Sequence, residues 1–179
     1  WHNYYPRPNT GLDEKWFYEK NSWLKSKHFK VSAFAPGDGS LRLPLYETLP
    51  TLEIHRYQSP FSASLSLIRD YMVDDVYIGD PGTSNEVCNQ FMEYLRQEAL
   101  LLHAISFNRK WDSYIYKYHQ NRLDVARDVV RSEQSRIVNK NDDIQQENTV
   151  SRRKGSITID NNLYMRYKGE LQVVKRKLP

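Results

Sequence analysis

A long segment without proline or glycine most constrains what this chain can fold into. It covers the 55 residues 84–138 and lacks both residue types that interrupt helices. An unbroken helix of that length would extend about 80 Å. At its start, Thr83 and Glu86 have the spacing of a capping box. The sequence therefore predicts one long helix, or two in series, from about residue 84.

This long segment changes in character along its length. Residues 99–107 are apolar on nearly every helical face, which is typical of a buried helix. Beyond Tyr118 the apolar residues become sparse. We therefore expect the last third to be an exposed rod.

The segment 28–61 has the opposite character, because it shows no sustained helical or strand periodicity. Four prolines interrupt its 34 residues: Pro36, Pro44, Pro50 and Pro60. Long irregular segments are uncommon in compact domains unless they serve a function. Since this one is rich in leucine and aromatic residues, we expect it to lie against another surface.

The remaining segments predict short elements. Residues 12–27 and 62–76 have the apolar spacing of amphipathic helices. Near the C-terminus, short alternating segments are separated by Asn161-Asn162 and Lys168-Gly169, pairs that suit hairpin turns. These last segments predict three antiparallel strands.

Together these patterns predict a mainly α chain with extended irregular arms and a small C-terminal antiparallel β-meander, a non-compact α+β fold. An N-terminal arm with one short amphipathic helix covers 1–61, and a helical region with the long helix covers 62–138. A polar linker covers 139–150, and a basic β-meander tail covers 151–179.

Charge is distributed unevenly along the chain. The formal net charge is +4, yet residues 151–179 hold eight basic and two acidic residues, a net +6, and residues 1–150 carry −2. Basic residues beside tyrosines are typical of nucleic-acid contacts, although solubilising charge explains them equally well. The candidate nucleic-acid-binding residues are Arg152, Arg153, Lys154, Lys175, Arg176 and Lys177.

Composition limits the classes of protein to consider. Mean hydropathy is −0.77, and the longest fully apolar run, 99–102, is far shorter than a membrane span needs. The single cysteine, Cys88, excludes an intramolecular disulfide and a cysteine-based zinc site. It favours a reducing intracellular compartment, with the mitochondrion as one candidate.

No motif for catalysis stands out. The acidic residues Asp70, Asp74, Asp75 and Asp80 lie close in sequence, but they match no calcium-loop spacing, and a solvated helix end is the simpler interpretation. The histidines form no metal pair, and the chain has neither a glycine-rich phosphate loop nor a nucleophile elbow. The sequence therefore predicts no catalytic residue, no metal site and no cofactor.

Contacts with other molecules are the remaining interpretation, because 13% of the residues are aromatic and such residues dominate interface energetics. We predict a non-catalytic structural or accessory subunit of a large intracellular assembly, with other protein subunits as its partners. The alternative is an RNA-contacting, ribosomal-type protein that uses the basic tail. The predicted partner-binding residues are Trp1, Tyr4, Tyr5, Trp16, Trp23, Phe34 and Trp111.

Overall fold

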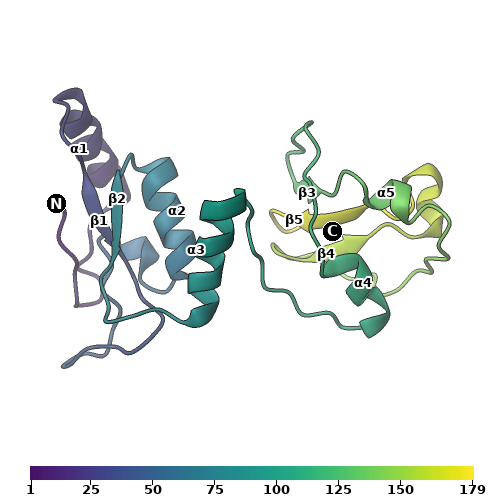
Figure 1. The fold of residues 1–179 in the computed structure, drawn as a ribbon, viewed down its shortest axis with the longest axis horizontal. Helices are drawn as coiled ribbons and strands as arrows, with labels where there is room; N and C mark the ends of the chain where they lie inside the picture. Colours follow the sequence, from purple (N-terminus) through teal and green to yellow (C-terminus); the bar gives the residue numbers. More distant parts are fainter. The chain divides into compact units, whose positions relative to one another are not determined.

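In the computed structural model, which describes residues 1–179, the chain forms two compact units (Figure 1). Unit 1 is Trp1–His103 and unit 2 is Ala104–Pro179. Helices account for 32% of the residues and strands for 13%, so the fold is α+β. The prediction of a mainly α, non-compact chain is wrong.

Unit 1 is built around a β-α-β arrangement. Its elements are α1 (Glu14–Ser26), β1 (Ser32–Ala35), α2 (Pro60–Asp70), β2 (Asp75–Ile78) and α3 (Asn85–Gln97). The two strands pair in parallel, with Ser32 opposite Asp75 and Ala35 opposite Ile78. Parallel neighbours need a crossover connection, and the chain between them supplies it with α2.

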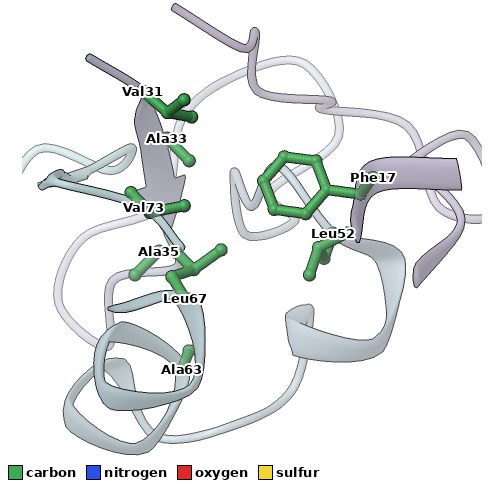
Figure 2. Packing of buried hydrophobic residues seen from close by; sticks show 8 residues of the cluster. All are labelled: Phe17, Val31, Ala33, Ala35, Leu52, Ala63, Leu67 and Val73. Atoms are coloured by element: carbon green, nitrogen blue, oxygen red, sulfur yellow. The ribbon is translucent and has the colours of Figure 1, made fainter. Parts of the chain in front are cut away.

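The core of unit 1 lies between the strands and the helices (Figure 2). The small residues Ala33 and Ala35 of β1 leave room for Leu67 of α2, and all three are fully buried. Phe17 of α1 fills the other end of the same core. The cluster comprises Phe17, Val31, Ala33, Ala35, Leu52, Ala63, Leu67 and Val73.

The helices of unit 1 differ from the predictions mainly in where they end. The first predicted helix contains α1, whose N-cap Asp13 accepts a hydrogen bond from Trp16 N at 2.9 Å. The second ends at Asp70, because the residues expected as its last turn form β2. Ser84, and not Thr83, caps α3.

The predicted long helix does not form. α3 ends at Gln97, and Glu98 adopts a left-handed conformation with φ 53°. The apolar residues expected to be buried beyond it lie in irregular chain, where Phe107 is 93% exposed. A lack of proline and glycine permits a helix, but tertiary packing decides whether it continues.

Unit 2 contains a three-stranded antiparallel sheet in the order β3-β5-β4. The strands are β3 (Val129–Arg131), β4 (Ile157–Ile159) and β5 (Leu171–Val174). The short helix α4 (Asp112–Ile115) precedes β3, and α5 (Ser135–Val138) lies between β3 and β4. The expected middle strand of the meander is a 3-10 segment, Asn162–Tyr167. The third strand comes instead from the region predicted to be a helical rod.

Hydrogen bonds from α5 and the residue after it hold the central strand of unit 2. Ser135 Oγ accepts a bond from Leu171 N at 2.9 Å, and Asn139 Nδ2 donates to Gly169 O at 3.1 Å. Leu171 and Val174 are buried. None of the helices in either unit combines the length and the hydropathy that a bilayer span requires.

Candidate functional site

The carboxyl ends of β1 and β2 form the candidate site. Because the strands are parallel, both end at the same edge of the sheet, where parallel sheets commonly bind their ligands. The segments 36–56 and 79–84 leave the strands there. With residues 5–11, which the contacts of Arg56 bring to them, we call these segments the rim.

Asp80 fixes the backbone of the rim from inside. It is buried, and its Oδ2 accepts hydrogen bonds from Gly37 N at 2.6 Å and Leu49 N at 3.1 Å. A Cβ atom on Gly37 would lie 2.6 Å from Asp80 Cβ, so only glycine fits. Asp80 Oδ1 has no hydrogen-bond partner.

Asp38 joins the rim to the start of α3. Its carboxylate accepts bonds from Ser84 N at 2.7 Å and Ser84 Oγ at 2.6 Å. Ser84 Oγ in turn accepts the N–H of Val87 in the first helical turn. The loop after β1 is therefore tied to the helix that follows β2.

Arg56 is the centre of the rim, although it is buried. Its guanidinium donates to both carboxylate oxygens of Glu53, at 2.7 and 2.6 Å. The other three N–H groups reach main-chain oxygens: Tyr5 O at 3.0 Å, Thr48 O at 2.7 Å and Arg7 O at 3.2 Å. All five donors of the side chain are thus satisfied.

Glu53 completes this network. Hydrogen bonds from Arg56, and further ones from the Asn9 and Gly11 N–H groups, lower the pKa of Glu53 to about 2. The carboxylate is therefore ionised and fully used in holding residues 5–11 against the loop after β1. It has no role left as a proton donor near neutral pH.

Two arginines of the rim are unengaged. The side chains of Arg7 and Arg42 are exposed and make no hydrogen bond or ion pair. Glu47 is half-buried, and its carboxylate accepts only the Tyr57 hydroxyl, at 3.1 Å. The rim therefore presents two free cations and one weakly engaged carboxylate above a rigid backbone.

The acidic residues that lie close together in the sequence do not gather at one place in the structure. Asp74 pairs with Lys25 and accepts the N–H of Val31 at 2.7 Å, while Asp80 lies at the opposite end of β2. No group of three or more potential metal ligands occurs. One usable signal was present in the sequence, since Gly-Asp pairs at 37–38 and 79–80 follow both short strands.

The structure brings together three of the predicted partner-binding residues. Trp1 stacks on Tyr77 with ring centroids 5.0 Å apart, and Phe34 contacts the edges of Trp1 and Tyr4 at 6.2 and 5.3 Å. Trp16 lines a separate pocket of about 330 Å³ that also includes Trp1.

The other predicted partner-binding residues are scattered. The backbone of Tyr5 belongs to the Arg56 network. Trp23 is exposed, with Lys20 Nζ 4.4 Å above its ring. Trp111 belongs to unit 2, where its Nε1 donates to Glu147.

In the basic tail, the two cationic triplets lie close together. Arg152 pairs with Leu178 through an antiparallel bridge, which places the triplets 152–154 and 175–177 beside each other. Arg176 forms an ion pair with Asp128 at 2.6 Å, and Arg152 Nε donates to Pro179 O. Part of the tail's charge is therefore engaged inside unit 2.

Unit 2 has its own perturbed carboxylate. Burial, with a contribution from the nearby Glu170 carboxylate, raises the pKa of Asp160 to about 6. Gln172 Nε2 lies between them, 3.4 Å from Asp160 and 3.3 Å from Glu170. A shallow polar depression of about 440 Å³ also lies on this unit, lined by Asn141, Asp142, Asp143, Asn162, Met165 and Lys168.

Family models cover nearly the whole chain. Residues 1–93 match the model described as 6-phospho-N-acetylmuramidase, N-terminal, and residues 100–179 match the one described as 6-phospho-N-acetylmuramidase, C-terminal. The two matches fall on units 1 and 2. A search of curated protein sequences finds no match.

Two solved structures share this fold. A conserved Enterococcus faecalis protein, described as having an unknown function, is 48% identical over 100% of this chain and 49% of its own, with a TM-score of 0.89. An uncharacterized B. cereus protein is 26% identical over 99% of this chain and 53% of its own, with a TM-score of 0.67. The chain thus spans about half the length of these structures.

These matches overturn the function predicted from sequence. Models of an enzyme family contradict a non-catalytic structural or accessory subunit of a large assembly, and equally an RNA-contacting, ribosomal-type or mitochondrial protein. The prediction that the chain is not enzymatic is wrong for the same reason. No local motif marks the candidate site, because the rim is assembled from segments far apart in sequence, as with Arg56 and Tyr5.

Proposed function

Because the chain belongs to the 6-phospho-N-acetylmuramidase family, we propose that it forms part of a glycosidase. The substrate is a saccharide that contains 6-phosphorylated N-acetylmuramic acid, and the reaction is hydrolysis of its glycosidic bond. Water adds to the anomeric carbon, and the leaving-group oxygen takes a proton. Since the chain spans about half of its solved relatives, this activity belongs to a longer assembly of residues.

The observation that carries this proposal is the pair of unengaged arginines on the rim. The proposed sugar has two anionic groups, a phosphate and a lactyl carboxylate. A guanidinium binds either group through two parallel hydrogen bonds. Arg7 and Arg42 are the rim cations without a partner. The Arg56 network fixes the main chain at Arg7 and at Thr48, six residues after Arg42.

Hydrolysis of a glycosidic bond also requires a pair of carboxyl groups. On the rim, Asp38 and Asp80 hold backbone and hydroxyl groups in place, and Glu53 is bound to Arg56. Glu47 is the remaining carboxylate. We propose that Glu47 faces the sugar. The second carboxyl group would then come from the half of the longer relatives that this chain does not match.

A chimera tests the proposal. This chain replaces the matching half of the Enterococcus faecalis protein, with which it is 48% identical, and release of the 6-phosphorylated sugar from a 6-phosphorylated disaccharide is measured. Arg42→Gln should raise KM at least tenfold by removing an anion contact. The matched control is Arg96→Gln, at an exposed position in the last turn of α3.

The outcomes are distinct. Hydrolysis that requires the 6-phosphate, and that Arg42→Gln impairs but Arg96→Gln does not, supports the proposal. A chimera that folds but cleaves phosphorylated and unphosphorylated disaccharides equally well would contradict the role of the rim arginines. Complete loss of hydrolysis in a folded chimera would contradict the assigned reaction.

A further inference from the structure

The two faces of the β1–β2 sheet are covered differently. Ala33 and Ala35 of β1 face α2 and belong to the core. Because side chains alternate along a strand, Phe34 and its register partner Tyr77 lie on the opposite face. Parallel sheets are normally buried on both faces, so the uncovered second face requires an explanation.

Aromatic side chains cluster on this second face. Trp1 stacks on Tyr77, and Phe34 contacts Trp1, Tyr4 and Tyr77. The outer members remain in solvent, since Trp1 is 82% exposed and Tyr77 is 42% exposed. Each such side chain can bury 150–250 Å², roughly, so this cluster is a large apolar surface without a cover.

The sheet is also open at one edge. The edge of β1 that faces away from β2 is occupied, because His2 N donates to Ser32 O and Thr51 N donates to Phe34 O, both at 2.9 Å. On the other side, β2 has β1 as its one neighbour. Asp75 N and Gly79 N point toward β1, so the alternate groups, Val76 N and Ile78 N, face the unpaired edge.

The length of the relatives indicates what covers this surface. The chain matches only 49% and 53% of two solved structures that share its fold. A polypeptide about as long as this chain is therefore present in each relative and has no counterpart here. It is large enough to supply both a strand for the open edge and a layer over the aromatic face.

We infer that the aromatic face and the free edge of β2 dock the polypeptide that corresponds to the unmatched half of these relatives. A strand of that polypeptide pairs with β2, and its side chains bury Trp1 and Tyr77. A second copy of this chain is the alternative occupant, and it would be seen as self-association through Tyr77.

Co-expression tests the inference through binding alone. The unmatched half of the Enterococcus faecalis protein is expressed with this chain, and the complex is measured by size-exclusion chromatography with light scattering and by titration. A 1:1 complex is expected, and Tyr77→Lys should weaken it at least tenfold. The control is Tyr18→Lys, because Tyr18 of α1 is similarly exposed, at 49%.

Amide hydrogen exchange supplies a second measurement that does not depend on the separate half folding. In the full-length chimera, the N–H groups of Val76 and Ile78 should exchange at least tenfold more slowly than in the chain alone. Equal exchange in both, or a complex that Tyr77→Lys leaves unchanged, would overturn the inference. So would self-association through Tyr77 that the other half fails to displace.

These outcomes are separate from those of the proposed function. A complex that forms through Tyr77 but releases no phosphorylated sugar supports this inference and contradicts the assigned reaction. Hydrolysis by a chimera whose β2 amides still exchange rapidly supports the assigned reaction and contradicts this inference.

Discussion

His55 is fully buried in unit 1 with neither ring nitrogen hydrogen-bonded. It belongs to the rim segment 36–56 and lies against Tyr71, with ring centroids 6.2 Å apart. Burial lowers the pKa of His55 to about 4, and the nearby Asp70 carboxylate opposes this shift only in part. The residue therefore acts as a neutral packing group.

The stability of the chain should depend on pH through His55. The unfolded chain takes up this proton near pH 6.5, whereas the folded chain resists it down to about pH 4. Stability is thus complete above pH 6.5 and falls as the pH drops toward 4, by up to about 3 kcal/mol. Urea unfolding across this range measures the fall.

The matched variant is His55→Leu, which keeps a similar volume and removes the titrating group. Because the ring nitrogens have no partners, an apolar replacement should cost little at pH 7. The difference in unfolding free energy between this variant and the wild type should shift in the variant's favour as the pH falls. A difference that stays constant from pH 7 to 4 would contradict the account.

The sequence predicts the local conformation of some rim residues but not their contacts. The Gly-Asp pairs at 37–38 and 79–80 could be recognised as turns. Their role could not be predicted, because Asp80 acts as a hydrogen-bond acceptor for the N–H groups of Gly37 and Leu49 only in the folded chain. Those partners are 43 and 31 residues away along the chain.

At the scale of elements, the helices α1 and α2 of unit 1 were easier to predict than its strands. α1 falls inside its predicted range because its capping and periodicity are local. β1 and β2 have four residues each, and the alanines of β1 carry little strand propensity. Their parallel pairing depends on a crossover helix, which local patterns do not reveal.

Gly169 shows how one position determines the geometry before β5. It has φ +79°, and a Cβ there would lie 2.7 Å from Asn139 Cβ. Gly169→Ala should therefore combine backbone strain with a clash and destabilise unit 2 by about 2–4 kcal/mol. Thermal unfolding, followed through the NMR signals of residues in unit 2, measures this loss.

Gly155 is the matched control for this substitution. It has a similar φ of +87°, but a Cβ there would have nothing within 4 Å. Gly155→Ala should therefore cost only the conformational strain, about 1 kcal/mol. Equal losses in the two variants would show that the contact with Asn139 has no energetic role.

At the scale of the whole molecule, the absence of a catalytic motif misled the sequence interpretation. The rim draws on residues 5–11, 36–56 and 79–84, and a catalytic counterpart is assigned to a half that this chain does not match. Trp1 and Phe34, two of the predicted partner-binding residues, lie in contact on one surface, and their role in binding a partner stays a prediction. Only the matches to the family models indicate an enzyme.

The division into two units predicts where proteases should cut first. The segment 100–107 has no regular secondary structure, and Ile105 and Phe107 are 87% and 93% exposed. Limited chymotrypsin digestion should therefore cleave near Phe107 and release two fragments that match the units. Mass spectrometry identifies the sites, and a first cut within the proline-rich segment 28–61 would contradict this expectation.

The contacts of Arg56 have a consequence for how the rim can vary in sequence. Arg56 holds Tyr5, Arg7 and Thr48 by their main-chain oxygens, so the fold places no demand on the Arg7 side chain. That position is free to accept other side chains while its backbone stays in place. Laboratory evolution of a new sugar preference would therefore begin at Arg7, with Arg56 kept constant.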